Sequence, residues 1–110
     1  MRMWMIEPSL MCKKHLLGEH CEIHMFVGTL NKGISIQGYI DKGLLEIHNL
    51  KLRHELLMKE MNRRGMKHRS SLPTFKEKVQ GSIDKEKNMI ELSTRCEECR
   101  KLQLKEKRNC

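Results

Sequence analysis

The chain has 110 residues, enough for one domain with a modest core. Its 22 lysines and arginines exceed its 14 acidic residues, so the formal charge is +8, which favours nucleic acid as partner over an acidic membrane surface or an acidic protein. No apolar run approaches the roughly 20 residues that a membrane span needs. Glu7 and Pro8 interrupt the apolar N-terminus, so it does not have the apolar core of a signal peptide, and we expect a cytoplasmic protein.

The N-terminal half predicts an extended arm followed by a helix. Residues 1–6 are largely apolar and carry no turn signal, so we expect them to lie extended on the body of the protein. Pro8 and Ser9 indicate the start of a helix that runs to about Leu30, because proline is well tolerated in a first turn. The core-facing stripe of this helix comprises Cys12, Leu16, Ile23, Val27 and Leu30.

A second set of side chains lines one edge of the same predicted helix. These residues follow one another at spacings of three and four positions: His15, Glu19, Glu22 and Phe26. Two carboxylates three positions apart repel each other. We therefore expect either a positive group beside Glu19 and Glu22 or one carboxyl that keeps its proton.

The glycine-rich segment from Asn31 to Asp41 predicts a loop. Asp41 is expected to cap a second helix that ends at Gly65, a residue type suited to a left-handed terminus. This helix has two apolar faces, one with Ile47, Leu50, His54, Leu57 and Met61, the other with Leu45, Leu52 and Leu56. We therefore expect it to pack between the first and third helices.

Ser82 is expected to cap a third helix that runs to about Leu104, on which Leu92, Cys96 and Cys99 share a face. Residues 105–110 are polar and are expected to fray. The predicted fold is all-α: one small domain over residues 1–110, with three main helices and an extended N-terminal arm. We expect it to be a monomer.

The five cysteines are odd in number and lack the spacing of a disulfide framework, so reduced thiols are expected. Cys96 and Cys99 form a C-x-x-C pair that could supply half of a tetrahedral zinc site. No second pair stands at zinc-finger spacing, so buried thiols are favoured over metal binding or redox chemistry. His20 and His24 have a chelating spacing but lack a clear further ligand. We predict no metal site and no cofactor.

Residues 11–28 resemble the first helix of the pyrimidine-dimer DNA glycosylases, the endonuclease V family of T-even phages. That family shows a His-Leu-aliphatic-small-Glu-x-x-Glu-aliphatic segment after a short N-terminal arm. The matching residues, in order, are His15, Leu16, Leu17, Gly18, Glu19, Glu22 and Ile23. The resemblance extends over most of residues 1–95.

Several shorter elements support the same register. Met1 and Arg2 fall where the family has its nucleophilic N-terminal residue and the arginine that follows it. Tyr39-Ile-Asp-Lys42 and Met61-Asn-Arg-Arg-Gly65 are similar to two further family elements, and Ser82-Ile83 to the start of its third helix.

The chain also departs from the family pattern. Cys21 and Met25 stand where the family has arginines, the loop after the first helix is shorter, and an aromatic, basic C-terminal strand is absent. These differences concern lesion preference more than the chemistry.

The resemblance implies a bifunctional DNA glycosylase and AP lyase, with hydrolase and lyase chemistry. The α-amine of Met1 would attack the sugar C1′ as the damaged base leaves, forming an imine (a Schiff base), and β-elimination would then cut the strand. Glu22 would stabilise the positive charge on the sugar and transfer protons, with Phe26 helping to desolvate it. An α-amine suits this role because its ordinary pKa is about 7.7–8.0, against about 10.4 for lysine. Arg2 is too large for removal of the initiator methionine, so Met1 should stay.

The expected partner is double-stranded DNA that contains a damaged base, which would bend or flip out to reach a surface groove. Candidate DNA contacts are Arg2, Lys13, Lys14, His15 and Glu19. Cyclobutane pyrimidine dimers are the favoured lesion, and a lyase acting mainly on abasic sites stays open. The alternatives are a non-catalytic basic protein of this fold that binds DNA or a host factor, and a small zinc module built on Cys96 and Cys99.

Overall fold

The computed structural model describes residues 1–66 and 71–108, with side chains to residue 105, and has no strand in these ranges. The five helices are α1 (Lys13–Asn31), α2 (Gln37–Asp41), α3 (Leu50–Arg63), α4 (Lys85–Arg95) and α5 (Glu97–Arg108). Two 3-10 turns accompany them, η1 (Pro8–Leu10) and η2 (Ile47–Asn49). The predicted all-α class is confirmed, and the first seven residues form the expected extended arm.

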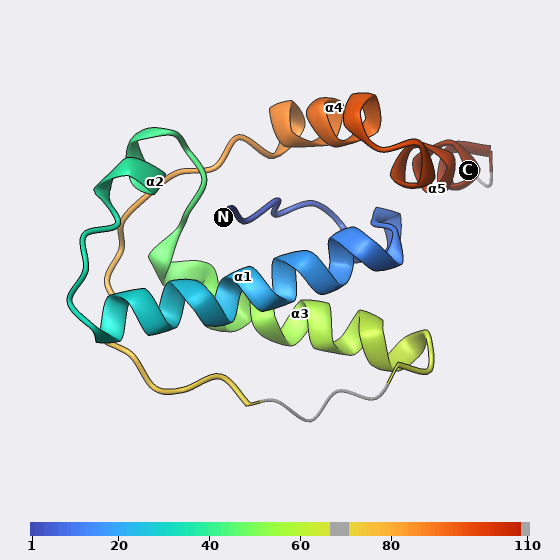
Figure 1. The fold of residues 1–110 in the computed structure, drawn as a ribbon. Helices are drawn as coiled ribbons and strands as arrows, with labels where there is room; N and C mark the ends of the chain where they lie inside the picture. The colour runs from blue at the N-terminus through green and yellow to red at the C-terminus, as the bar shows by residue number, and fades with distance from the viewer. Residues whose placement is uncertain (67–70, 109–110) are drawn as a thin grey trace.

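The N-terminal arm lies between α4 on one side and α1 with α3 on the other (Figure 1). On the α4 side, the amide of Asn88 donates to the carbonyl of Trp4 at 2.9 Å. On the other side, Arg53 of α3 donates to the carbonyl of Ile6 at 2.7 Å, and Met3 N–H donates to the carbonyl of Leu44. The prediction that the second helix lies centrally is therefore wrong: the arm occupies that place, and α3 packs on α1.

The first helix begins later than predicted, since η1 is separated from α1 by extended backbone at Met11 and Cys12. The break lies at Met11, which is held in place at both its side chain and its backbone carbonyl. Its side chain is fully buried, and its carbonyl accepts from Arg64 at 2.6 Å. The predicted helix end near Leu30 agrees with the observed end at Asn31. The apolar stripe is confirmed, with Leu16, Ile23 and Val27 fully buried.

The predicted second helix is two elements. Asp41 ends the short helix α2 instead of capping a long one, and Gly43, at φ +69°, stops the helix from continuing. After the 3-10 turn η2, the chain becomes α-helical again only at Leu50, and α3 ends at Arg63 with Gly65 in the left-handed region, as expected for that glycine.

Only one of the two predicted apolar faces of this helix is buried. The side chains of Ile47, Leu50, His54, Leu57 and Met61 are buried, as predicted. Leu45 is also buried, whereas Leu52 and Leu56 are 55% and 39% exposed. The second face is therefore open to solvent because the arm, and not the third helix, approaches α3.

The predicted third helix is also divided. Asp84, not Ser82, caps α4 by accepting from Lys87 N–H at 3.0 Å. Extended backbone at Cys96 then ends α4, and α5 runs from Glu97 to Arg108. Asn109 and Cys110 lie outside the described residues. The shared apolar face is confirmed by the burial of Leu92 and Cys99.

The segment that returns the chain to α4 passes close to the start of α3. A Cβ on Gly81 would lie 2.0 Å from the carbonyl oxygen of Leu45, and Gly81 has φ +99°. The backbone on either side is held there, with Ile47 N–H donating to the Gln80 carbonyl and Ile83 N–H to Glu46. Only glycine permits this close approach, which sets where α4 begins.

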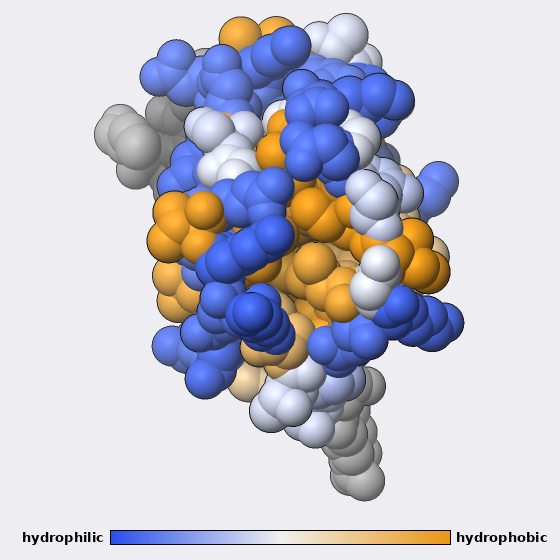
Figure 2. Space-filling view, turned by 90° about the vertical axis from the view of Figure 1, so that its left-hand side faces the viewer, coloured by the Kyte–Doolittle hydropathy of each residue, from blue (hydrophilic) through white to orange (hydrophobic). Residues whose placement is uncertain are grey.

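The surface combines charged and apolar areas. Figure 2 shows, on the side that faces left in Figure 1, apolar side chains in a hollow bordered by hydrophilic ones. No helix in the described part of the chain is both long and apolar enough to cross a membrane.

A buried ion pair joins α1 to α3. Arg53 donates to both carboxylate oxygens of Glu19, at 2.5 and 3.0 Å, and the two side chains are 3% and 0% exposed. This is the positive group expected beside the two carboxylates of α1. The guanidinium also contacts the sulfur of Met11 at 3.4 Å, in addition to the carbonyl of Ile6.

The Arg53→Ala variant tests this pair. It leaves the Glu19 carboxylate buried without its partner, so we expect the free energy of unfolding to fall by about 3–5 kcal/mol, measured by urea denaturation. Lys101→Ala removes an exposed pair with Glu97 and should cost less than about 1 kcal/mol. Equal losses in the two variants would contradict the structural role of Arg53.

Candidate active site

A small hollow of about 240 Å³ lies where the arm crosses the first turns of α1. Its lining comprises Arg2, Trp4, Lys14, His15, Gly18, Glu19, Glu22 and Arg95. Most of the predicted site residues therefore meet in one place. Met1 directly precedes Arg2 and is half-buried, whereas Lys13 is exposed and does not line the hollow.

The chain terminus is tied to Glu22. The backbone N–H of Arg2 donates to the Glu22 carboxylate at 3.2 Å, although the two residues are 20 positions apart. The α-amine belongs to the residue just before this hydrogen bond. The backbone of Arg2 therefore meets Glu22, and the pairing of the α-amine itself with this carboxylate stays a prediction of the family register.

The side chain of Arg2 holds the arm against α4. Its guanidinium donates to both carboxylate oxygens of Glu91, at 3.0 and 3.2 Å, and to the side-chain oxygen of Asn88 at 2.8 Å. It also lies 3.8 Å over the ring of Trp4, a cation–π contact. The hydrogen bond from Arg2 lowers the pKa of Glu91, which keeps this carboxylate charged. Arg2 therefore positions the terminus, in addition to the phosphate contact expected for it.

Glu19 requires a correction. It was a candidate DNA contact, but it is 1% exposed and both of its carboxylate oxygens accept from Arg53. A buried carboxylate with its acceptor sites engaged does not reach a nucleic acid. Its observed role is to hold Arg53, and Arg53 in turn holds the arm.

Positive charge surrounds the hollow. Lys14 and Arg95 are exposed, and both line it. Burial, together with the charges of Lys14 and Arg95, lowers the pKa of His15, so its ring is neutral at neutral pH. Phe26, expected beside Glu22, is fully buried and packs edge-on against Tyr39 at 5.1 Å between ring centroids. The hollow thus combines a carboxylate, a nearby amine and cations at the rim.

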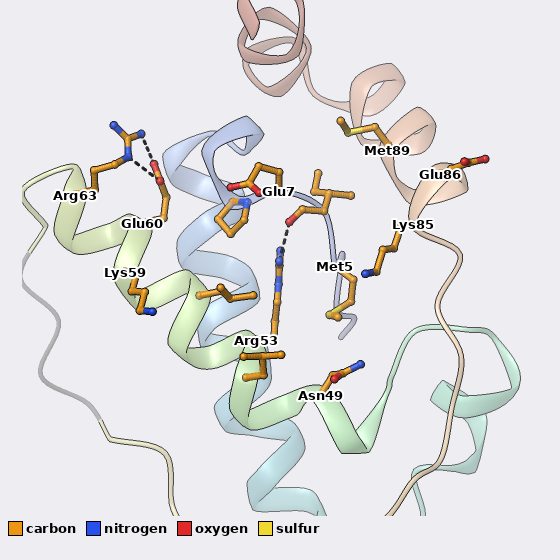
Figure 3. A pocket seen from close by; sticks show the side chains of 14 residues that line it. Met5, Glu7, Asn49, Arg53, Lys59, Glu60, Arg63, Lys85, Glu86 and Met89 are labelled. Carbon is orange, nitrogen blue, oxygen red and sulfur yellow. Dashed lines mark hydrogen bonds and ion pairs between the residues drawn. The ribbon is translucent and has the colours of Figure 1, made fainter. Parts of the chain in front are cut away.

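A larger hollow of about 680 Å³ lies elsewhere, between the arm, α3 and the start of α4 (Figure 3). Its walls are mostly apolar, and Met5, Leu52 and Met89 contribute to them. Neither Met1 nor Glu22 lines it. Size alone does not indicate the site of chemistry, since Glu22 and most of the other predicted site residues line the smaller hollow.

Several residues that line the smaller hollow, or that hold Arg2 beside it, could not be identified from local sequence patterns. Trp4 is the only tryptophan of the chain, and its place in the arm could have drawn attention to it. Asn88, Glu91 and Arg95 carry no comparable signal. They reach the arm only because α4 folds back over it, a long-range contact that no local pattern reports.

Among the residues that the structure describes, two groups of side chains could hold a metal ion. One consists of Cys12, His15, Cys96 and Cys99, and the other of His20, His24 and His54. In each group the potential ligand atoms lie within 4.8 Å of one another. Sequence spacing indicated only part of each group, because the remaining members come from segments distant in the chain.

Comparison with known proteins agrees with the resemblance seen in α1. The family model described as pyrimidine dimer DNA glycosylase matches residues 1–74. No curated protein and no solved structure matches the chain. The matched segment includes the arm, α1 and α3, and leaves α4 and α5 outside. Since it covers well over half of the sequence, the chain belongs to the family of pyrimidine dimer DNA glycosylases.

Proposed function

We propose that this DNA-repair glycosylase is also an AP lyase that works through the α-amine of Met1 and the carboxylate of Glu22. The observation that carries the proposal is the hydrogen bond from Arg2 N–H to Glu22 at 3.2 Å. It fixes Arg2, the residue that follows the α-amine, on an acid of α1 that lines a hollow with a cationic rim.

The α-amine is the proposed nucleophile. An α-amine is far less protonated at neutral pH than a lysine side chain, since its ordinary pKa is about 7.7–8.0. The amine attacks the sugar C1′ while the bond to the damaged base breaks, and the base leaves with a proton. The C1′–O4′ bond then opens, O4′ takes the proton that the nitrogen loses, and the imine forms. With the aldehyde of an abasic site, the amine adds to C1′ and water leaves as the imine forms. Loss of a C2′ proton then permits β-elimination of the 3′ phosphate.

Glu22 has two proposed roles. As a carboxylate it stabilises the positive charge that develops on the sugar during base loss, an electrostatic effect that is large in a partly buried site. It also accepts and returns protons during imine formation and elimination. Its half-buried position on α1 gives it a defined orientation while one face stays reachable.

The proposed substrate is double-stranded DNA with a damaged base, bound by one monomer. Lys13, Lys14 and Arg95 are exposed cations that can neutralise phosphates near the hollow. The target nucleotide must leave the base stack to reach C1′, which costs least at a damaged or missing base. The favoured lesion is a cyclobutane pyrimidine dimer.

Borohydride trapping tests the nucleophile. With duplex DNA that carries an abasic site, we expect a covalent adduct, located on Met1 by mass spectrometry of the digested protein. Adding Gly-Ser before Met1 should abolish it, because the amine moves away from Glu22. Lys14→Ala should bind DNA less tightly yet keep the adduct. An adduct on a lysine side chain would overturn the assignment, and no adduct on any substrate would favour a DNA-binding protein without activity.

Glu22→Gln tests the acid. The substitution keeps the size and the acceptor for Arg2 N–H but removes the charge. We expect turnover to fall by about 10²–10⁴-fold, with folding and DNA affinity retained, measured by single-turnover cleavage and by fluorescence anisotropy. Glu55→Gln, exposed on α3, is the matched control and should keep full activity. Full activity of Glu22→Gln would remove this carboxylate from the mechanism.

Glu91→Gln tests the tether of the arm. Losing about 1.4 kcal/mol from the Arg2 contact should lower the cleavage rate about 10-fold, because the terminus is held less firmly. Because the folded-state pKa of Glu91 is lowered, the tether is intact at neutral pH and weakens as the pH falls through that pKa. Glu86→Gln on the same helix should leave the rate unchanged. A rate equal to that of the unmodified protein in both variants would show that the tether is dispensable.

A further inference from the structure

We propose that Cys12, His15, Cys96 and Cys99 bind one zinc ion and fasten the start of α1 to the junction of α4 and α5. Cys12 and His15 form one pair, and Cys96 and Cys99 form the other. Cys12 and Cys96 are 84 positions apart in sequence, yet all four ligand atoms lie within 4.8 Å of one another. The site is separate from the amine and carboxylate of the proposed function, and it reverses the expectation of a chain without metal.

The distances between ligand atoms fit a tetrahedron. Zinc bonds of about 2.3 Å to sulfur and about 2.0–2.1 Å to nitrogen place two sulfurs roughly 3.8 Å apart, and a sulfur and a nitrogen roughly 3.6 Å apart. The sulfurs of Cys12 and Cys96 are 3.7 Å apart. The Nδ1 atom of His15 lies 3.6 Å from the sulfur of Cys99 and 3.2 Å from that of Cys12. A central ion can reach all four with little movement.

Each pair occupies the same place on its helix. Cys12 is the N-cap residue of α1, and His15 lies in the first turn; Cys96 directly precedes α5, and Cys99 lies in its first turn. Two helix N-termini, which carry partial positive charge, therefore meet at the sulfurs. Backbone N–H groups donate to these sulfurs, from Cys12 to Cys99 at 3.2 Å and from Cys99 to Cys96 at 3.5 Å. Such hydrogen bonds stabilise thiolates and orient metal ligands.

The type of ligand identifies the metal. Three thiols and one imidazole form a Cys₃His set, which suits zinc and not the hard cations calcium or magnesium. Four protein ligands leave no open position, so the site is structural. On binding, the three thiols release their protons to solvent. Three thiolates around Zn²⁺ leave one net negative charge, near the cations of Lys14 and Arg95.

A metal ion accounts for the cluster better than a disulfide or the packing of free thiols. A disulfide needs sulfurs about 2.05 Å apart, and those of Cys12 and Cys96 are at 3.7 Å. Simple packing of buried thiols does not account for an imidazole nitrogen turned toward two sulfurs. Only Cys99 of the four is fully buried; the others are half-buried, which gives an ion a route to the site.

The proposed zinc would also support the arm. His15 contacts Trp4 of the arm edge-on, with ring centroids 6.0 Å apart. The same junction fixes the end of α4, the helix from which Asn88 and Glu91 hold Arg2. Cys96 and Cys99 lie beyond the segment that the family model matches, so the proposed metal would secure a C-terminal part outside that segment.

Metal analysis of the full-length protein, purified under reducing conditions, is the direct test. We expect a zinc ion that the Cys96→Ser/Cys99→Ser double variant loses. Cys21→Ser, an exposed cysteine outside the cluster, and His24→Ala, in the histidine group, should each retain it. Chelation should lower the melting temperature of the unmodified protein but not that of the double variant.

Cobalt substitution gives an answer that does not depend on how the variants fold. In the unmodified protein, Co²⁺ should show strong thiolate-to-metal charge-transfer absorption and the intense visible bands of tetrahedral coordination. His15→Cys should still bind the ion, with four sulfurs. A reduced protein that takes up neither Zn²⁺ nor Co²⁺, a cobalt spectrum without thiolate bands, or a Cys12–Cys96 disulfide found by mass spectrometry would overturn the proposal.

Discussion

The guanidinium of Arg53 joins three segments of this small protein. It pairs with Glu19 of α1, donates to the carbonyl of Ile6 in the arm and contacts the sulfur of Met11. A buried ion pair is seldom a large net gain in stability, because both charges lose their hydration. Its importance here is geometric: once buried, each group must have its partner, so the arm can cross α1 at one place only.

That constraint determines where the terminus lies. One end of the arm is held by Arg53, while the other is held on α4 by Arg2, through Asn88 and Glu91. Between these two points, the backbone N–H of Arg2 donates to Glu22. The proposed active site would lose its geometry if the chain end were mobile, and buried or partly buried charge holds the arm on both sides. Glu19 thus serves the site indirectly.

The C-terminal helices have a different relation to the site. Residues 1–74 match the family, and α4 and α5 lie beyond them, yet α4 supplies the contacts that hold Arg2. The thiols and the imidazole of the proposed zinc site lie between α5 and the start of α1. Because the apolar fraction of the chain is modest, α4 and α5 can bury little additional apolar surface. A bound metal ion would supply stability that this burial does not.

The sequence by itself determined the helical class and the buried faces of α1 and α3. It also predicted, through a family register, that Met1 pairs with Glu22. These features depend on the spacing and order of residues within one segment, which can be read without knowing what that segment contacts. Helix boundaries at Met11, Asp41 and Cys96 were decided by tertiary contacts, since a buried anchor, a glycine turn and a bend override helix preference. So were the burial of Glu19 and both potential metal clusters. Such contacts join residues far apart in the chain, and only the packed fold brings them together.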